Sequence, residues 1–111
     1  MIESCNKMVL AVISGDDYSA TVKHLNEEGF YATILSSTGG FLRKKSITLM
    51  IGTSSEKVSR VLSVIEKHAG TRMETTFLTN PSEAGMPAVP ISVRTGGSVA
   101  FVLDVEKSVK Y

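Results

Sequence analysis

The sequence predicts an α+β sandwich with the element order β-α-β-β-α-β. Three observations lead to this fold class. Residues 7–14 form a nearly continuous apolar run, apolar residues recur with helical spacing from Val58 to Ile65, and the order strand, helix, glycine, strand occurs twice. We expect residues 1–111 to form one domain, because a chain of this length buries a single core.

The first third of the chain is predicted to form a strand, a helix and a second strand. The apolar run Lys7–Ser14 is typical of a short strand that is buried on both faces. Asp16 and Asp17 follow it, and acidic residues favour the positive end of a helix dipole. Gly29 is expected to end this helix, and Phe30–Ser37 is expected to form the next strand.

The middle of the chain predicts a strand followed by the clearest helix of the sequence. In Ser46–Thr53, alternate residues are apolar, which indicates a strand with one buried face. Thr53 and Glu56 then have the spacing of a capping box, in which two side chains close the first turn of a helix. Gly70 is expected to end this helix as Gly29 ends the first.

The last third predicts an extended segment, a long loop and a final strand. Arg72–Thr79 is a weaker candidate for a strand. The loop from Thr79 to Pro90 holds all three prolines of the chain, and we assign it no regular structure. Val99–Val105 is expected to be the last strand, and Phe101 on this strand is expected to lie in the core.

This element order is that of a ferredoxin-like sandwich with a long loop before its last strand. When the four strands are numbered along the chain, their spatial order in this fold is 4-1-3-2, and each strand runs antiparallel to its neighbours. The topology brings two glycine-rich turns to one edge, although they are distant in sequence. These turns are Thr38-Gly39-Gly40 and Thr95-Gly96-Gly97.

The predicted edge suits a phosphate group. Two consecutive glycines permit positive φ angles and a close approach of the backbone, so that amide groups can point at one anion. Hydroxyl groups and positive charges flank the two turns, and they come from Thr38, Thr95, Ser98, Arg43, Lys44, Lys45 and Arg94. The alternative is that the glycines serve only tight turns and that the basic residues form a solvated loop.

Phe41 follows Gly39-Gly40 directly, and an apolar ring in a polar turn requires a surface that covers it. The ring either stacks on a nucleobase or packs against another subunit. Tyr31 and Phe101 are further candidates for stacking, although the alternation of its strand favours a core position for Phe101.

Composition and spacing argue against several other functions. A net charge of +1 gives no general attraction to nucleic acid or to an anionic membrane, and no apolar run is long enough for membrane insertion.

Cys5 is the only cysteine, and we expect His24 and His68 to stay apart, so neither a disulfide nor a metal site is predicted. No nucleophile with a base and no nucleotide-binding loop motif is present, so we expect no enzyme and no cofactor. Residues 1–7 do not resemble an export signal, and we expect a cytoplasmic protein.

Two segments, residues 32–70 and residues 96–106, carry a more specific signal. The string TGGFLR in the first segment is its most specific part. On these residues the chain resembles the PII-like cyclic-di-AMP receptor family, and the similarity extends from Met8 to Val105. The resemblance implies a single PII-like domain that forms a homotrimer and binds one cyclic dinucleotide in each cleft between subunits.

The resemblance also implies which residues line the ligand. Thr33 would contact adenine, and the turn after the second strand would supply backbone donors and a ring. Together with Thr38 and Arg43 from the turn chemistry above, the candidate site is Thr33, Thr38, Gly39, Gly40, Phe41, Leu42, Arg43, Ser46, Gly52 and Phe101. Ser46 and Tyr31 stand where the family often has asparagine and arginine, so the ligand is cyclic-di-AMP or a related adenine nucleotide.

The sequence therefore predicts a non-enzymatic signalling protein with an unknown downstream protein partner. Ligand binding is expected to order Thr38–Lys45 and Thr79–Pro90 and so to change the surface that a partner meets. One rival is a small hydrolase of the acylphosphatase type, which would need an asparagine near the phosphate loop. A second rival is a structural trimer that binds no ligand.

Overall fold

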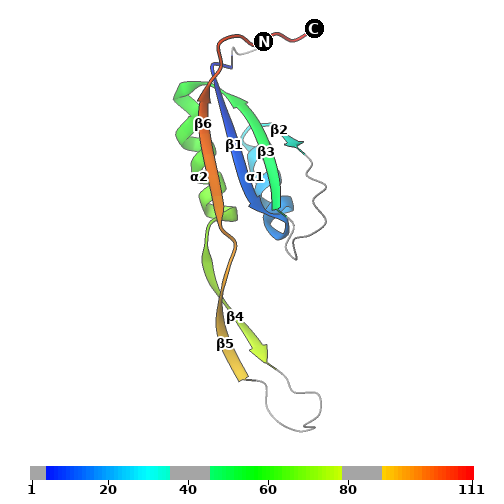
Figure 1. Ribbon diagram of the computed structural model, residues 1–111, viewed down its shortest axis with the longest axis vertical. Coiled ribbons are helices and arrows are strands. Elements are labelled where there is room, and N and C mark those ends of the chain that lie inside the picture. The colour runs from blue at the N-terminus through cyan, green and yellow to red at the C-terminus, as the bar shows by residue number, and fades with distance from the viewer. Residues whose placement is uncertain (1–4, 36–45, 79–88) are drawn as a thin grey trace.

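The computed structural model describes residues 5–35, 46–78 and 89–111. Its strands and helices are β1 (Lys7–Ser14), α1 (Tyr18–Glu27), β2 (Ala32–Leu35), β3 (Ser46–Thr53), α2 (Val58–Ala69), β4 (Arg72–Leu78), β5 (Val89–Thr95) and β6 (Ser98–Asp104), with 3-10 turns at Gly15–Asp17 and Ser55–Lys57. Figure 1 shows a two-layer arrangement in which a four-stranded sheet stands in front of both helices. β4 and β5 lead away from this body as a two-stranded ribbon.

The order of the sheet is β2-β3-β1-β6, and every neighbouring pair of strands is antiparallel. This is the predicted order, and it confirms the α+β, ferredoxin-like architecture. β1 and β3 have the predicted bounds and pair along their whole length, from Lys7 opposite Thr53 to Ser14 opposite Ser46. Both are central strands, which explains why their sequences are so apolar.

β2 begins at Ala32, two residues after the predicted start of the strand Phe30–Ser37, of which Ser36 and Ser37 lie outside the described residues. Phe30 belongs to the turn after α1, because its amide donates to the Leu25 carbonyl oxygen at 2.9 Å and its side chain is buried in the core. Gly29 has a φ of +85°, which confirms that a glycine ends this helix.

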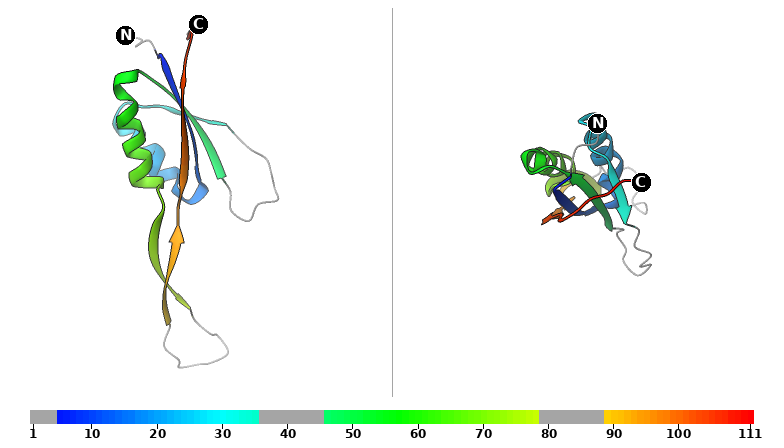
Figure 2. Two further views of the ribbon diagram at one scale, coloured as in Figure 1. Left: turned by 60° about the vertical axis from the view of Figure 1, so that its left-hand side comes forward. Right: turned by 90° about the horizontal axis from the view of Figure 1, so that it is seen from above.

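The hydrophobic core lies between the two helices and one face of the sheet. Figure 2 shows both helices on the same side of the sheet. The buried apolar side chains come from β1 and β3 (Val9, Ala11, Ile13, Leu49, Ile51), from α1 and the turn after it (Leu25, Phe30), and from α2 (Val61, Val64, Ile65, Ala69). One layer of helices therefore covers one face of the sheet.

The opposite face is covered by no helix of the described residues, and we call it the open face. Strand alternation and register place on it Met8, Leu10, Val12, Ser14, Thr33, Leu35, Ser46, Thr48, Met50, Gly52, Val99, Phe101 and Leu103. The prediction that Phe101 is buried is wrong for the single chain, where this residue is 56% exposed. The reason is that β6 turns Ala100 and Val102 toward the helix side instead.

The start of α2 is closed differently from the prediction. The Oγ1 of Thr53 is buried and has no hydrogen-bond partner among the described residues, so the expected capping box with Glu56 does not form. Asn6, which precedes β1, accepts a hydrogen bond with its Oδ1 from the amide of Ser55 at 2.9 Å. Spacing along the helix could not reveal this partner, because Asn6 is 49 residues earlier in the chain. It comes close only because the start of β1 lies beside the end of β3.

β4 and β5 form a ribbon that we call the arm. Their register runs from Arg72 opposite Thr95 to Leu78 opposite Val89. The loop predicted to end at Pro90 is therefore a strand from Val89 onward, while residues 79–88 lie outside the described residues. Proline is acceptable in this strand because each strand of a two-stranded ribbon has one edge that needs no backbone donor.

α1 and α2 lie antiparallel, since Glu28 directly after α1 forms an ion pair with Arg60 near the start of α2. The rings of His24 and His68 stack between them, with centroids 3.7 Å apart and planes at 16°. The prediction that these histidines stay apart is wrong, because the packing of two helices decides which side chains meet across them. In the described part of the chain, neither helix has the length and apolar character needed to cross a lipid bilayer.

Replacing Leu49 by alanine is expected to lower the free energy of unfolding by about 2–5 kcal/mol, because it leaves a cavity in the core. Its neighbour in register, Ile34, points to the same side of the sheet but is 44% exposed. Ile34→Ala is the matched control and should cost clearly less. Denaturant unfolding of both variants measures the difference, and equal losses would contradict this description of the core.

Candidate functional site

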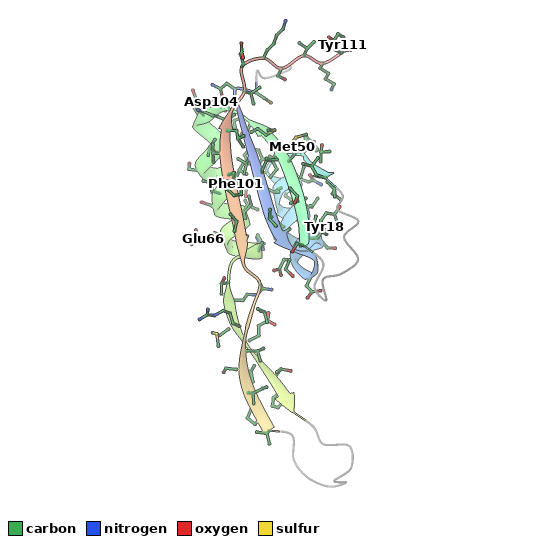
Figure 3. All side chains as sticks on the ribbon, in the orientation of Figure 1. Tyr18, Met50, Glu66, Phe101, Asp104 and Tyr111 are labelled. Carbon is green, nitrogen blue, oxygen red and sulfur yellow. The ribbon has the colours of Figure 1, made fainter. Side chains whose placement is uncertain are left out.

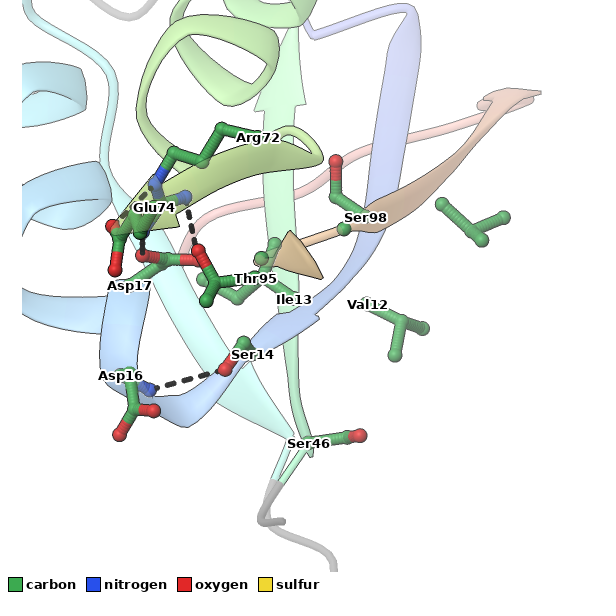
Figure 4. A pocket seen from close by; sticks show the side chains of 13 residues that line it. Val12, Ile13, Ser14, Asp16, Asp17, Ser46, Arg72, Glu74, Thr95 and Ser98 are labelled. Atoms are coloured by element: carbon green, nitrogen blue, oxygen red, sulfur yellow. Dashed lines mark hydrogen bonds and ion pairs between the residues drawn. The ribbon is translucent and has the colours of Figure 1, made fainter. Parts of the chain in front are cut away.

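A cavity of about 340 Å³ opens at the end of the sheet where β1 ends and β3 and β6 begin. Figure 4 shows its polar side chains, with Arg72, Glu74 and Asp17 gathered on one side and Ser46 on another. The lining includes three apolar residues (Val12, Ile13, Val99), the two glycines Gly96 and Gly97, and eight polar residues (Ser14, Asp16, Asp17, Ser46, Arg72, Glu74, Thr95, Ser98). Segments from both ends of the sequence thus meet at the predicted edge.

An ion pair between Asp17 and Arg72 forms one wall of this cavity. Asp17 is only 5% exposed, and its two oxygens accept from Arg72 Nη2 at 2.6 Å and from Arg72 Nη1 at 3.2 Å. Arg72 Nε also donates to Glu74 Oε1 at 3.1 Å. The hydrogen bonds to Asp17, and secondly to Glu74, raise the pKa of Arg72 above its already high ordinary value, so this guanidinium stays charged.

The turn Gly96-Gly97 packs directly on this ion pair. The two residues have φ angles of +74° and +108°, as the sequence predicted for consecutive glycines. A Cβ at Gly96 would overlap the carbonyl oxygen of Gly70 and lie 2.6 Å from Arg72 Nη1. The amide of Gly97 donates to the Ala69 carbonyl oxygen at 3.0 Å, so it fastens β6 to the end of α2 and is not free to bind an anion.

The charge of the cavity differs from the expectation of a positive edge. Its described lining holds the carboxylates of Asp16, Asp17 and Glu74 and a single cation, Arg72. Arg94, which was expected to contribute, pairs with Met73 on the arm and is not among the lining residues. The wall described here therefore offers hydrogen-bond acceptors and hydroxyl groups rather than a phosphate site.

Unused hydrogen-bonding capacity remains in the same wall. The Oγ1 of Thr95 is buried and has no partner among the described residues. A buried hydroxyl without a partner is uncommon in folded proteins, and it marks a place where an additional polar group would be favourable.

The predicted ligand residues fall into two groups. Residues 38–43, which include Thr38, Gly39, Gly40, Phe41, Leu42 and Arg43, lie outside the described residues, as do Lys44 and Lys45. Thr33, Ser46, Gly52 and Phe101 are described, and all four lie on the open face.

Thr33 and Phe101 occupy one row across the sheet. Thr33 on β2 is opposite Met50, Met50 is opposite Leu10, and Leu10 is opposite Phe101 on β6. Figure 3 labels Met50 and Phe101 on strands that flank β1. Three strand spacings separate the ends of this row by about 14 Å, so Thr33 and Phe101 do not meet within one chain.

Ser46 and Gly52 lie near opposite ends of β3. Ser46 lines the cavity, whereas Gly52 lies beside Cys5, whose Sγ would be 3.3 Å from a Cβ at this position. Of the four described ligand residues, Ser46 alone lines the cavity, although all four share a surface.

The open face also differs from the cavity in its chemistry. None of the described residues of the open face carries a charge, and their polar side chains are the hydroxyls of Ser14, Thr33, Ser46 and Thr48. Apolar side chains and the Phe101 ring make up the rest. Such a surface suits the flat apolar area and the hydrogen-bonding edge of a nucleobase.

Sequence reasoning missed the Asp17–Arg72 pair, since 55 residues separate its members. The sequence did draw attention to Asp17, because Asp16 and Asp17 come shortly after a buried strand. This pair of acids predicted the start of a helix, and the 3-10 turn Gly15–Asp17 with Ser14 as its cap is consistent with that. The sequence pattern could not predict that the side chain of Asp17 is buried.

The described residues offer little support for the predicted rival hydrolase. The described part of the cavity lining includes no asparagine, and Asn6 accepts a hydrogen bond at the start of α2. Among the described residues, no group of three or more histidine, cysteine or acidic side chains could hold a metal ion.

Comparison with known proteins gives two findings. Residues 6–111 match the protein family described as "Cyclic-di-AMP receptor". The chain is also similar in structure to a functionally unknown protein from Pediococcus pentosaceus ATCC 25745, whose crystal structure has a TM-score of 0.77 to it. The two are 34% identical, and the similarity covers 96% of this chain and 98% of the other.

Gly96→Ala is expected to destabilise the protein more than Gly29→Ala. Both glycines have positive φ, which costs an L-residue about 1–2 kcal/mol, but a Cβ at Gly29 meets nothing within 4 Å. At Gly96 the same methyl group overlaps the backbone and crowds the Asp17–Arg72 pair. Denaturant unfolding of the two variants isolates this steric contribution, and equal costs would show that the turn does not pack as described.

Proposed function

Because the chain belongs to the cyclic-di-AMP receptor family, we propose that it is a non-enzymatic signalling protein that binds cyclic-di-AMP, or a related adenine nucleotide, between the subunits of a homotrimer. The observation that carries this proposal is the shared location of Thr33, Ser46, Gly52 and Phe101 on the open face. These positions were selected by resemblance alone, without reference to which face of the sheet they occupy.

The open face supplies the contact between subunits. Val99, Phe101 and Leu103 on β6 are 55%, 56% and 38% exposed, and Leu35 on β2 is 42% exposed. Apolar area in water costs about 25 cal/mol per Å², so a contiguous apolar sheet face is stabilised when another surface covers it. A second copy of the same face is the surface available in every solution of this protein.

The positions of Thr33 and Phe101 fit an assembly with three-fold symmetry. They lie on opposite edge strands of the same face. A neighbour that places its β2 edge beside the β6 edge of this chain would bring its Thr33 toward Phe101 here. Such a head-to-tail contact is heterologous, and it closes into a ring when three copies are related by a three-fold axis.

Each cleft of this ring would hold one ligand. The Thr33 hydroxyl would hydrogen-bond an adenine edge, and the Phe101 ring would cover a base. Residues 38–43 would supply backbone donors and the Phe41 ring by resemblance. Tyr31, which is 76% exposed just before β2, is a further ring at the same edge.

We place this receptor in the cytoplasm, where it would act through a downstream protein that is unknown. The ligand changes the output only if it binds one conformation of the trimer better than another. Catalysis has no role in this proposal, since nucleotide binding alone carries the signal.

Thr33→Val is expected to weaken cyclic-di-AMP binding by about tenfold, because one hydrogen bond to a base is worth about 1–1.5 kcal/mol. Valine keeps the shape and strand preference of threonine at this exposed position. Thr76→Val on the arm is the matched control and should leave affinity unchanged. Isothermal titration measures both.

Absence of heat from the unmodified protein with cyclic-di-AMP, ATP and ADP at tens of micromolar would refute nucleotide binding altogether. Equal affinity of the Thr33→Val variant and the unmodified protein would refute only the role of this hydroxyl.

Phe101→Glu is expected to dissociate the trimer, since a carboxylate on the open face would be buried without a partner. Phe77→Glu is the matched control, because Phe77 on the arm is similarly exposed, at 60%. Light scattering after size exclusion should give three times the chain mass of 11.9 kDa for the unmodified protein and for the control. A monomeric unmodified protein, or a trimeric Phe101→Glu variant, would contradict the proposed assembly.

A further inference from the structure

The stacked histidines lie in the helix layer, away from both the open face and the cavity. His24 belongs to α1 and His68 to α2, and their ring centroids are 3.7 Å apart. Side chains on a helix lean toward its N-terminus, so those of two antiparallel helices lean toward each other. This explains how residues near the C-terminal ends of two antiparallel helices come into face-to-face contact.

The proton on the neutral His24 ring has a defined position. Nδ1 of His24 lies 2.8 Å from the carbonyl oxygen of Ala20, one turn earlier. A carbonyl oxygen only accepts, so Nδ1 carries the proton and donates it in this contact. Nε2 of the neutral ring then carries the free lone pair.

The surroundings of His68 favour its neutral form. Partial burial lowers the pKa of His68 below its ordinary value, and the positive charges of His24 and Lys67 lower it further. Glu27 on α1 acts in the opposite direction but does not cancel these effects. The charged groups that act on this ring therefore come from both helices, and their sum opposes protonation.

We propose that the His24–His68 stack is a proton-sensitive contact between α1 and α2, which holds while the rings are neutral and weakens when both are protonated. Two imidazolium rings stacked at this distance repel each other, whereas neutral rings attract by dispersion and stacking. The Glu28–Arg60 ion pair joins the same two helices and contains no histidine.

Weakening of the contact between the two histidines would also affect the cavity, because the ends of both helices contact a residue that lines it. Asp17 directly precedes α1, and the Gly70 carbonyl directly follows α2. Both accept hydrogen bonds from Arg72. A change in the spacing of the helices therefore acts on the Asp17–Arg72 pair, whatever ligand the protein binds.

The sign of the pH dependence follows from the lowered pKa of His68. The unfolded chain takes up a proton near pH 6.5, while the folded chain does so only at lower pH. The unfolded state thus binds more protons in this window. The stabilisation from the stack is present above this pH, and it is lost as the pH falls below it.

A double-mutant cycle with His24→Gln, His68→Gln and the double variant tests the proposal without any nucleotide. Denaturant unfolding at about pH 8 and about pH 5, at one fixed protein concentration, gives the coupling between the two rings at each pH. We expect favourable coupling at the higher pH that is lost or reversed at the lower pH. A parallel cycle with Glu28→Gln and Arg60→Gln is the control and should keep its coupling at both.

Proton NMR of the folded protein provides a second measurement that does not depend on unfolding. The His68 ring is expected to titrate below about pH 6.5, and the pH midpoint of its titration should rise in the His24→Gln variant. Coupling of equal size at both pH values, or a His68 midpoint that His24→Gln leaves unchanged, would overturn the proposal.

Discussion

Two helices cover one face of a sheet whose two faces are both apolar, and this imbalance governs the rest of the molecule. An antiparallel sheet in a monomer ordinarily turns polar side chains to water on its second face. Here the second face carries Leu10, Met50 and Phe101 in one row, and the residues of this face that the structure describes include no charged side chain. The uncovered face is the physical reason for proposing that the functional unit is an assembly of chains and that its ligand lies between them.

The burial of Asp17 is a second constraint, and it fixes the end of the sheet. A carboxylate at 5% exposure is costly unless a positive group pairs with it, and Arg72 at the base of the arm does so with two hydrogen bonds. Gly96 must then lack a side chain, because the pair and the Gly70 carbonyl fill the space where a Cβ would be. The start of α1, the end of α2, the arm and β6 are thus joined at one point.

Strands that are marked by their own sequence could be predicted: β1 by its continuous apolar run and β3 by its alternation, and both agree with their predicted bounds. Alternation is a property of one strand, so it survives without knowledge of neighbours. β5 was missed because Pro90 suggests a loop, and only the pairing with β4 shows that the ribbon tolerates it. The alternation of β6 was also predicted, but the register of β6 with β1 decides which of its two alternating sets of side chains faces the helices.

Contacts between distant elements could not be predicted in the same way. The partners Asp17 and Arg72, Asn6 and Ser55, and His24 and His68 are each chosen by how two elements pack, and no spacing within one element encodes this. The site shows the same division. Resemblance selected positions that share the open face, whereas reasoning from glycines and basic residues expected a positive edge that the described wall of the cavity does not provide.

This difference determines how a cyclic dinucleotide would lie in the proposed cleft. Its bases are flat and largely apolar, and they match the uncharged open face with its threonine hydroxyls and the Phe101 ring. Its phosphodiesters carry the negative charge, and they are repelled by the carboxylates of Asp16 and Glu74 in the cavity. The bases must therefore point toward the open face and the phosphates away from these acids. In this proposal the cations for the phosphates come from outside the described wall of the cavity, and Arg43 in the TGGFLR string is the candidate that the sequence offers.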